Sequence, residues 1–130
     1  MGWFSKDKEK EEKKESGLPW ERLTSVDQLK MAIEGSSEKP ILLFKHSARC
    51  NISAMALNGF VRSWSGTPEE IDIYYLDLLN HRDVSNAIAL QTGVMHQSPQ
   101  VIVLKNKEVV YTATHSGIDA RAALNSIKNR

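Results

Sequence analysis

The chain of 130 residues contains a single cysteine, Cys50. One cysteine cannot form an internal disulfide, which excludes the disulfide-stapled secreted folds. The sequence also lacks an apolar run of transmembrane length, and the charged run that begins at Lys6 leaves no room for the apolar region of a signal peptide. With 17 basic and 16 acidic residues the net charge is only +1, so neither nucleic acid nor an anionic membrane is an expected partner. These absences favour a cytoplasmic protein whose thiol stays reduced.

The length and the hydrophobic fraction of 41% are typical of one globular domain. Residues 6–15 are all charged, five of each sign, with nothing apolar to anchor them. Such a run is typical of a solvated segment. We therefore expect a charged flexible tail over residues 1–17 and a folded domain over residues 18–130.

Short apolar runs and helical periodicities alternate through the folded part. Strands are expected near residues 20–23, 41–44, 71–78, 101–104 and 109–111, and helices near 25–35, 52–64, 84–93 and 119–128. Strands separated by helices predict a parallel core, to which the final hairpin adds an antiparallel edge. The order βαβαβαββα indicates the α/β class and matches a thioredoxin-like fold, with a mixed sheet of four or five strands flanked by helices. An unrelated small α/β protein could share this order.

Cys50 falls between a buried strand and the first turn of a helix. The unpaired N–H groups and the dipole of a helix N-terminus favour an anion, and Arg49 adds a positive charge, so a reactive thiolate is expected there. Ser53 occupies the place where dithiol oxidoreductases carry a second cysteine, and a serine cannot resolve a mixed disulfide. A thiol from outside must then do so. The alternative is a buried structural cysteine.

Ser98-Pro99 stands directly before another buried strand. A cis peptide bond at this position would present a sharp turn beside the cysteine loop, and the backbone of Ser98 could then pair with an extended substrate. The alternative is an ordinary trans proline that opens a strand.

Three segments together resemble the monothiol bacilliredoxins: Phe44 to Ser53, Gly93 to Val101, and Ala113 to Ser116. The resemblance implies a thioredoxin-like fold in which Cys50 attacks S-bacillithiolated client proteins and removes the bacillithiol. We expect no bound cofactor and no metal, with bacillithiol or a similar low-molecular-weight thiol as the co-substrate. The family usually has proline after the cysteine, where this chain has Asn51. The residues expected to form the substrate-binding loops are Arg49, Asn51, Ser53, His96, Ser98 and Pro99.

Other functions are less well matched by the sequence. The four histidines and Cys50 have no spacing that is typical of a zinc site. Monothiol glutaredoxins carry a glycine after the cysteine, where this chain has Asn51. His96 and His115 could line the thiol pocket or be solvated loop residues. The remaining alternative is a thioredoxin-fold adaptor that binds proteins and whose cysteine is not catalytic.

Overall fold

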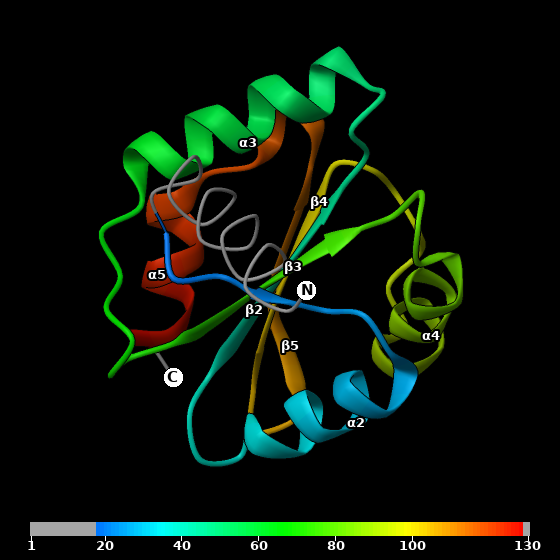
Figure 1. Ribbon diagram of the computed structural model, residues 1–130. Helices are drawn as coiled ribbons and strands as arrows, with labels where there is room; N and C mark the ends of the chain where they lie inside the picture. Colours follow the sequence, from blue (N-terminus) through cyan, green and yellow to red (C-terminus); the bar gives the residue numbers. More distant parts are fainter. Residues whose placement is uncertain (1–17, 129–130) are drawn as a thin grey trace, which may run out of the picture.

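The structure is a computed structural model, and it describes residues 18–128. A five-stranded mixed sheet lies between helices on its two faces (Figure 1). The strands are β1 (Glu21–Arg22), β2 (Ile41–His46), β3 (Asp72–Asp77), β4 (Gln100–Lys105) and β5 (Glu108–Thr114). The helices are α2 (Val26–Gly35), α3 (Asn51–Ser63), α4 (Arg82–Thr92) and α5 (Ala120–Lys128), with a 3-10 turn, η1 (His115–Gly117). The expected tail, residues 1–17, lies outside the described residues.

The strand order in the sheet is β1-β3-β2-β4-β5. The first three of these strands are parallel to one another, β4 is antiparallel to β2, and β5 is antiparallel to β4. The predicted parallel core and antiparallel hairpin are therefore confirmed. Because β2 and β4 run in opposite directions, the end of β2 lies beside the start of β4.

Local sequence signals set several boundaries. The Ser25 hydroxyl accepts a hydrogen bond from Gln28 N at 3.1 Å and so caps α2. Gly93 ends α4 in the left-handed conformation, with φ of 73°, which glycine adopts without steric cost. Asn106 and Lys107 also have positive φ, 54° and 65°, as a two-residue hairpin turn between β4 and β5 requires.

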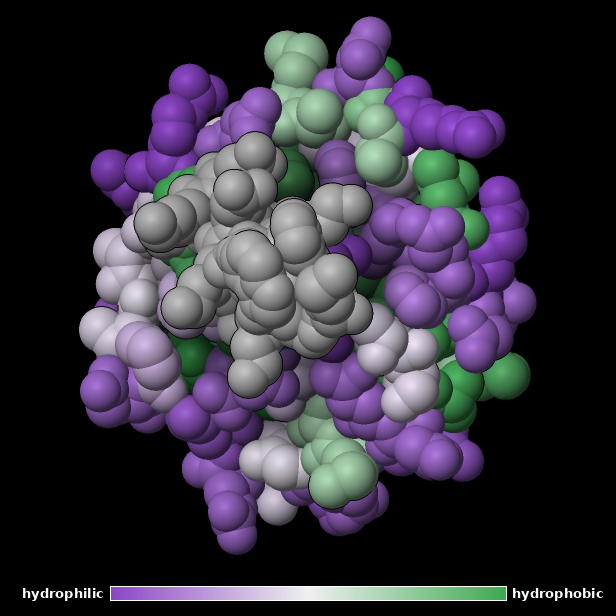
Figure 2. Space-filling model, in the orientation of Figure 1, coloured by the Kyte–Doolittle hydropathy of each residue, from purple (hydrophilic) through white to green (hydrophobic). Residues whose placement is uncertain are grey.

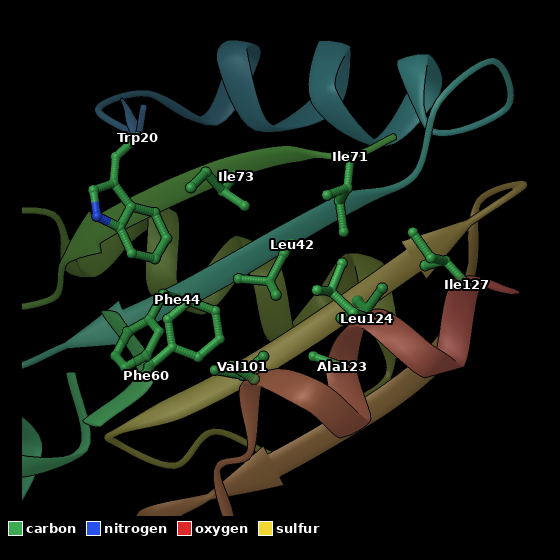
Figure 3. Close-up of a cluster of buried hydrophobic side chains, with 12 residues drawn as sticks. Trp20, Leu42, Phe44, Phe60, Ile71, Ile73, Val101, Ala123, Leu124 and Ile127 are labelled. Carbon is green, nitrogen blue, oxygen red and sulfur yellow. The ribbon is translucent and has the colours of Figure 1, made fainter. Parts of the chain in front are cut away.

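The core consists of two apolar layers, one on each face of the sheet. Helices α3 and α5 cover one face and α2 and α4 the other (Figure 1). In the first layer Phe44 of β2 lies beside Phe60 of α3, with ring centroids 5.3 Å apart, and Trp20 packs on both rings (Figure 3). Burying such side chains is the main stabilising contribution to the fold.

The outer surface is mostly polar on the face that Figure 2 shows. Where the described residues are visible in Figure 2, hydrophilic side chains predominate and the apolar ones stand in small separate groups. Within residues 18–128, no helix combines the length and the apolar character needed to cross a bilayer.

Candidate active site

Three loops meet at one end of the sheet. The register pairs His46 at the end of β2 with Asp77 at the end of β3, while Gln100 at the start of β4 pairs with Lys45 and with Thr114 at the end of β5. The loop after β2 (47–50), the loop before β4 (93–99) and η1 after β5 therefore leave the sheet at the same end. One backbone hydrogen bond links two of them directly, from His115 N to Pro99 O at 3.1 Å.

Cys50 is the N-cap of α3. Its backbone N–H donates to Ser47 O at 3.1 Å, and its carbonyl accepts from Ala54 N at 3.0 Å, so a turn before the helix and the helix itself both fix its backbone. The side chain makes no capping hydrogen bond and is half-buried. This is the strand–helix junction predicted from the sequence. It places the thiol beside N–H groups that lack a partner within the helix, where an anion is stabilised.

Ser53 holds the first turn of α3 against β2. Its side chain is fully buried, and its Oγ accepts from Ser47 N at 3.1 Å and lies 2.7 Å from His46 Nδ1. Burial lowers the pKa of His46, against opposing effects of Asp77 and Ser53, so the ring is neutral at neutral pH. Ser53 thus has a structural hydrogen-bond role that its position in the sequence did not reveal.

Asp77 faces this pair from the neighbouring strand. Its Oδ2 accepts from Asn80 Nδ2 at 2.6 Å, whereas Oδ1 is buried and has no hydrogen-bond partner within the described part of the chain. The negative charge raises the pKa of His46 and so partly offsets the effect of burial. A carboxylate near the ring therefore limits how far burial lowers the pKa of the ring.

A Ser53→Ala variant is expected to lower the free energy of unfolding by about 1–3 kcal/mol, because it leaves the Ser47 N–H and the His46 ring without their buried partner. Urea denaturation followed by circular dichroism measures the change. Ser63→Ala, at the exposed end of the same helix, is the matched control. Equal stability of the two variants would contradict the role assigned to Ser53.

The second loop contains a cis peptide bond between Ser98 and Pro99, as predicted. Pro99 is buried, and the Ser98 hydroxyl oxygen is buried without a hydrogen-bond partner within residues 18–128. The other predicted loop residues lie on the surface: Arg49 and Asn51 flank Cys50, and His96 precedes the proline by three residues. The structure thus gathers all the predicted site residues at one end of the sheet, and their contacts with a substrate stay a prediction.

Two buried polar residues near this site were not predicted. Lys45 is 0% exposed and Gln100 is 1% exposed, and Lys45 Nζ lies 2.6 Å from His96 Nδ1. Burial lowers the pKa of Lys45 to about 8. The pKa of His96 is also lowered, first by burial and then by the positive charges of Lys45 and Arg82. The available signal was that Lys45 directly follows the apolar run of residues 41–44, where the predicted strand ends.

Next to the cysteine, α3 and η1 line a half-open cavity of about 330 Å³. Ile52 and Met55, which line it, are 57% and 73% exposed. His115 lines it from η1, and its φ of 51° is uncommon for a residue other than glycine. The cavity offers an apolar surface within one helical turn of Cys50.

The described residues contain no group of three or more histidine, cysteine, aspartate or glutamate side chains placed to hold a metal ion. His46 and His96 instead have hydrogen-bond partners in Ser53 and Lys45. What the site offers chemically is one accessible thiol at a helix N-terminus, next to a loop that ends in a cis proline.

Comparison with solved structures identifies the same fold. A structure described as a candidate oxidoreductase with a thioredoxin fold is 34% identical, with a TM-score of 0.68, over 82% of this chain and 91% of that one. Thioredoxin from Malassezia sympodialis is 17% identical, with a TM-score of 0.63, over 85% of this chain and 89% of its own. Thioredoxin f from spinach chloroplast is 15% identical, with a TM-score of 0.60, over 83% and 89%.

The family comparison is more specific than the fold. The family model for monothiol bacilliredoxin BrxC matches residues 21–123, which include Cys50, Ser53 and the whole Pro99 loop. Together with the thioredoxin fold, this match indicates a thiol redox function. The chain therefore belongs to the monothiol bacilliredoxin family.

Proposed function

We propose that this protein removes bacillithiol, or a similar low-molecular-weight thiol, from mixed disulfides on client proteins, and that Cys50 is the attacking thiol. The observation that carries the proposal is the pairing of Cys50 with Ser53 on the first turn of α3. The only cysteine of the chain is half-buried at the helix N-terminus, and a hydroxyl occupies the place of a second thiol. Membership of the monothiol bacilliredoxin family supports the choice of small thiol.

The exchange consists of two displacements. The Cys50 thiolate attacks the small-thiol sulfur of the mixed disulfide; a new S–S bond forms, the old one breaks, and the client leaves as a thiolate that takes a proton from water. A second small-thiol anion then attacks the small-thiol sulfur on Cys50. This step regenerates the Cys50 thiolate and releases the symmetric small-thiol disulfide, so the external thiol is the reductant.

The surroundings of Cys50 support each part of this reaction. Cys50 is the N-cap of α3, beside backbone N–H groups that lack a partner within the helix. The buried Ser53 carries no thiol that could close an internal disulfide, so the cycle requires the second small molecule. The backbone at Ser98 is proposed to pair with an extended client segment, and Asn51 and His96 are proposed to border the small thiol. Such chemistry suits the reducing cytoplasm, which is the proposed location.

The test uses one client protein loaded in turn with bacillithiol, glutathione and cysteine as mixed disulfides. Release of the client thiol is followed after addition of catalytic amounts of the protein and an excess of the matching small thiol. The proposal predicts the fastest release from the bacillithiol form. Equal rates for all three would leave the exchange chemistry in place and overturn the assignment to bacillithiol. Binding of the client without release from any form would favour the adaptor alternative.

A further inference from the structure

Lys45 is an unusual residue for the interior of this fold. It is 0% exposed at the end of β2, on the face of the sheet that α2 and α4 cover. Lysine is almost never fully buried unless it is paired. Yet the hydrogen bonds that it makes within the described residues go to neutral groups, His96 Nδ1 at 2.6 Å and Gln100 Oε1 at 3.2 Å. A buried charge held by neutral partners is costly, which argues for a use other than stability.

The contact with His96 determines how the imidazole ring carries its proton. A lysine ammonium group has three donors and no acceptor, so Nδ1 of His96 must accept, and the proton of the neutral ring must reside on Nε2. The Ser85 hydroxyl of α4 also lies near Nδ1, at 3.3 Å. With Nδ1 turned inward to Lys45 and Ser85 and the residue itself exposed, the Nε2–H is directed away from the protein interior.

Gln100 fixes the backbone of the same loop. Its Nε2 donates to Met95 O at 3.0 Å, and its Oε1 accepts from Gln97 N at 3.3 Å and from Lys45. The residues on both sides of His96 are thus fastened to a buried amide that Lys45 itself orients. The loop that these bonds hold leads directly into Pro99, at the end of the sheet where Cys50 lies.

Two cationic side chains act on the His96 ring. Lys45 of β2 and Arg82 of α4 are both cationic, and both lower the pKa of the ring. The ring is therefore neutral near pH 7, while Lys45 still carries its charge below about pH 8. An imidazole N–H near two positive charges attracts an anionic acceptor more strongly than a neutral one.

We propose that Lys45 is a positioning residue that acts through His96: it fixes the ring so that Nε2–H donates a hydrogen bond to a carboxylate of the small thiol held on Cys50. This inference rests on the proposed function and adds to it a substrate class, small thiols that carry a carboxylate. It assigns Lys45 a role in recognition that a purely structural lysine would not have.

The first test measures which nitrogen of the His96 ring carries the proton. In wild-type protein at pH 7, ¹⁵N NMR of the His96 side chain is expected to show an unprotonated Nδ1 and a protonated Nε2. In Lys45→Met the donor is lost, and a mixture of the two tautomers is expected. Lys30→Met, an exposed lysine on α2, is the matched control and should leave the spectrum as in wild type. A protonated Nδ1 in wild type, or an unchanged tautomer in Lys45→Met, would overturn the proposal.

The second test measures selectivity, with a client modified by glutathione or by glutathione diethyl ester, which lacks the carboxylates. Wild type is expected to release the client from the glutathione form roughly three to ten times faster than from the diethyl ester form. This ratio is the effect expected of one charge-assisted hydrogen bond at an exposed site. In Lys45→Met the ratio should fall close to one. If that variant does not fold, His96→Ala, at an exposed loop position, should give the same loss.

The two proposals fail in different ways. If the wild-type protein releases both client forms through Cys50 at equal rates, the role assigned to Lys45 and His96 is wrong, and the proposed function is unaffected. Release that continues without Cys50 would remove the proposed function, whatever the ratio.

Discussion

Replacement of Cys50 by serine is expected to abolish the catalysed release of the client thiol. Only the slower release that the free small thiol brings about without the protein should remain. A serine hydroxyl is neither ionised near neutral pH nor able to form a disulfide, so neither displacement can occur. Because Cys50 is half-buried at a helix end and its side chain makes no capping hydrogen bond, the variant should fold as wild type does. Client release and circular dichroism, measured on the same samples, separate loss of the thiol from loss of the fold.

A chemical control is available because the chain has one cysteine. Iodoacetamide treatment of the wild-type protein alkylates the Cys50 sulfur without any substitution in the chain, and the same loss of release is expected. A Cys50→Ser protein that freed the client at the wild-type rate would contradict thiol exchange through Cys50.

A Phe44→Ala variant is expected to lower the free energy of unfolding by about 3–5 kcal/mol, the usual cost of removing a buried aromatic ring. Phe44 is 0% exposed, and its ring contacts those of Trp20 and Phe60 at centroid distances of 5.9 and 5.3 Å. The substitution leaves a cavity between the sheet and α3 that the surrounding side chains cannot fill.

Urea denaturation measures this effect. Met31→Ala on α2 is the control, since that side chain is 75% exposed and its loss should change stability by no more than about 0.5 kcal/mol. Since small domains have a total stability of only about 5–15 kcal/mol, the Phe44 variant could be partly unfolded at 37 °C. Equal stability of the two variants would contradict the core described above.

Much of the fold could be predicted from local patterns. The run from Ile41 to Phe44 gave a strand buried on both faces, and the capping pattern at Ser25 gave the start of α2. The end of β2 was less well predicted, because the strand continues through Lys45 and His46, two polar residues that are typical of a loop. They are buried there because partners from other elements satisfy them, and such tertiary hydrogen bonds override local preference.

The candidate site was predictable to the extent that its residues are close in sequence. Cys50 and Ser53 share one helical turn, and the cis bond at Pro99 followed from one short segment. The Lys45–His96 contact joins residues 51 positions apart. It depends on the antiparallel register of β2 and β4, which no local periodicity determines. The hydrogen bond between His46 and Ser53 likewise requires that the loop after β2 fold back on the strand.

The central claim is that Cys50 itself accepts the small thiol, and the mass of the intact protein tests this most directly. The protein is incubated with an S-bacillithiolated client in the absence of free small thiol, quenched with acid, and analysed by mass spectrometry. The account predicts a mass increase equal to one bacillithiol in disulfide linkage, located on Cys50, together with a client of unmodified mass. A freed client beside a protein of unchanged mass, or an adduct with the mass of the client, would contradict it.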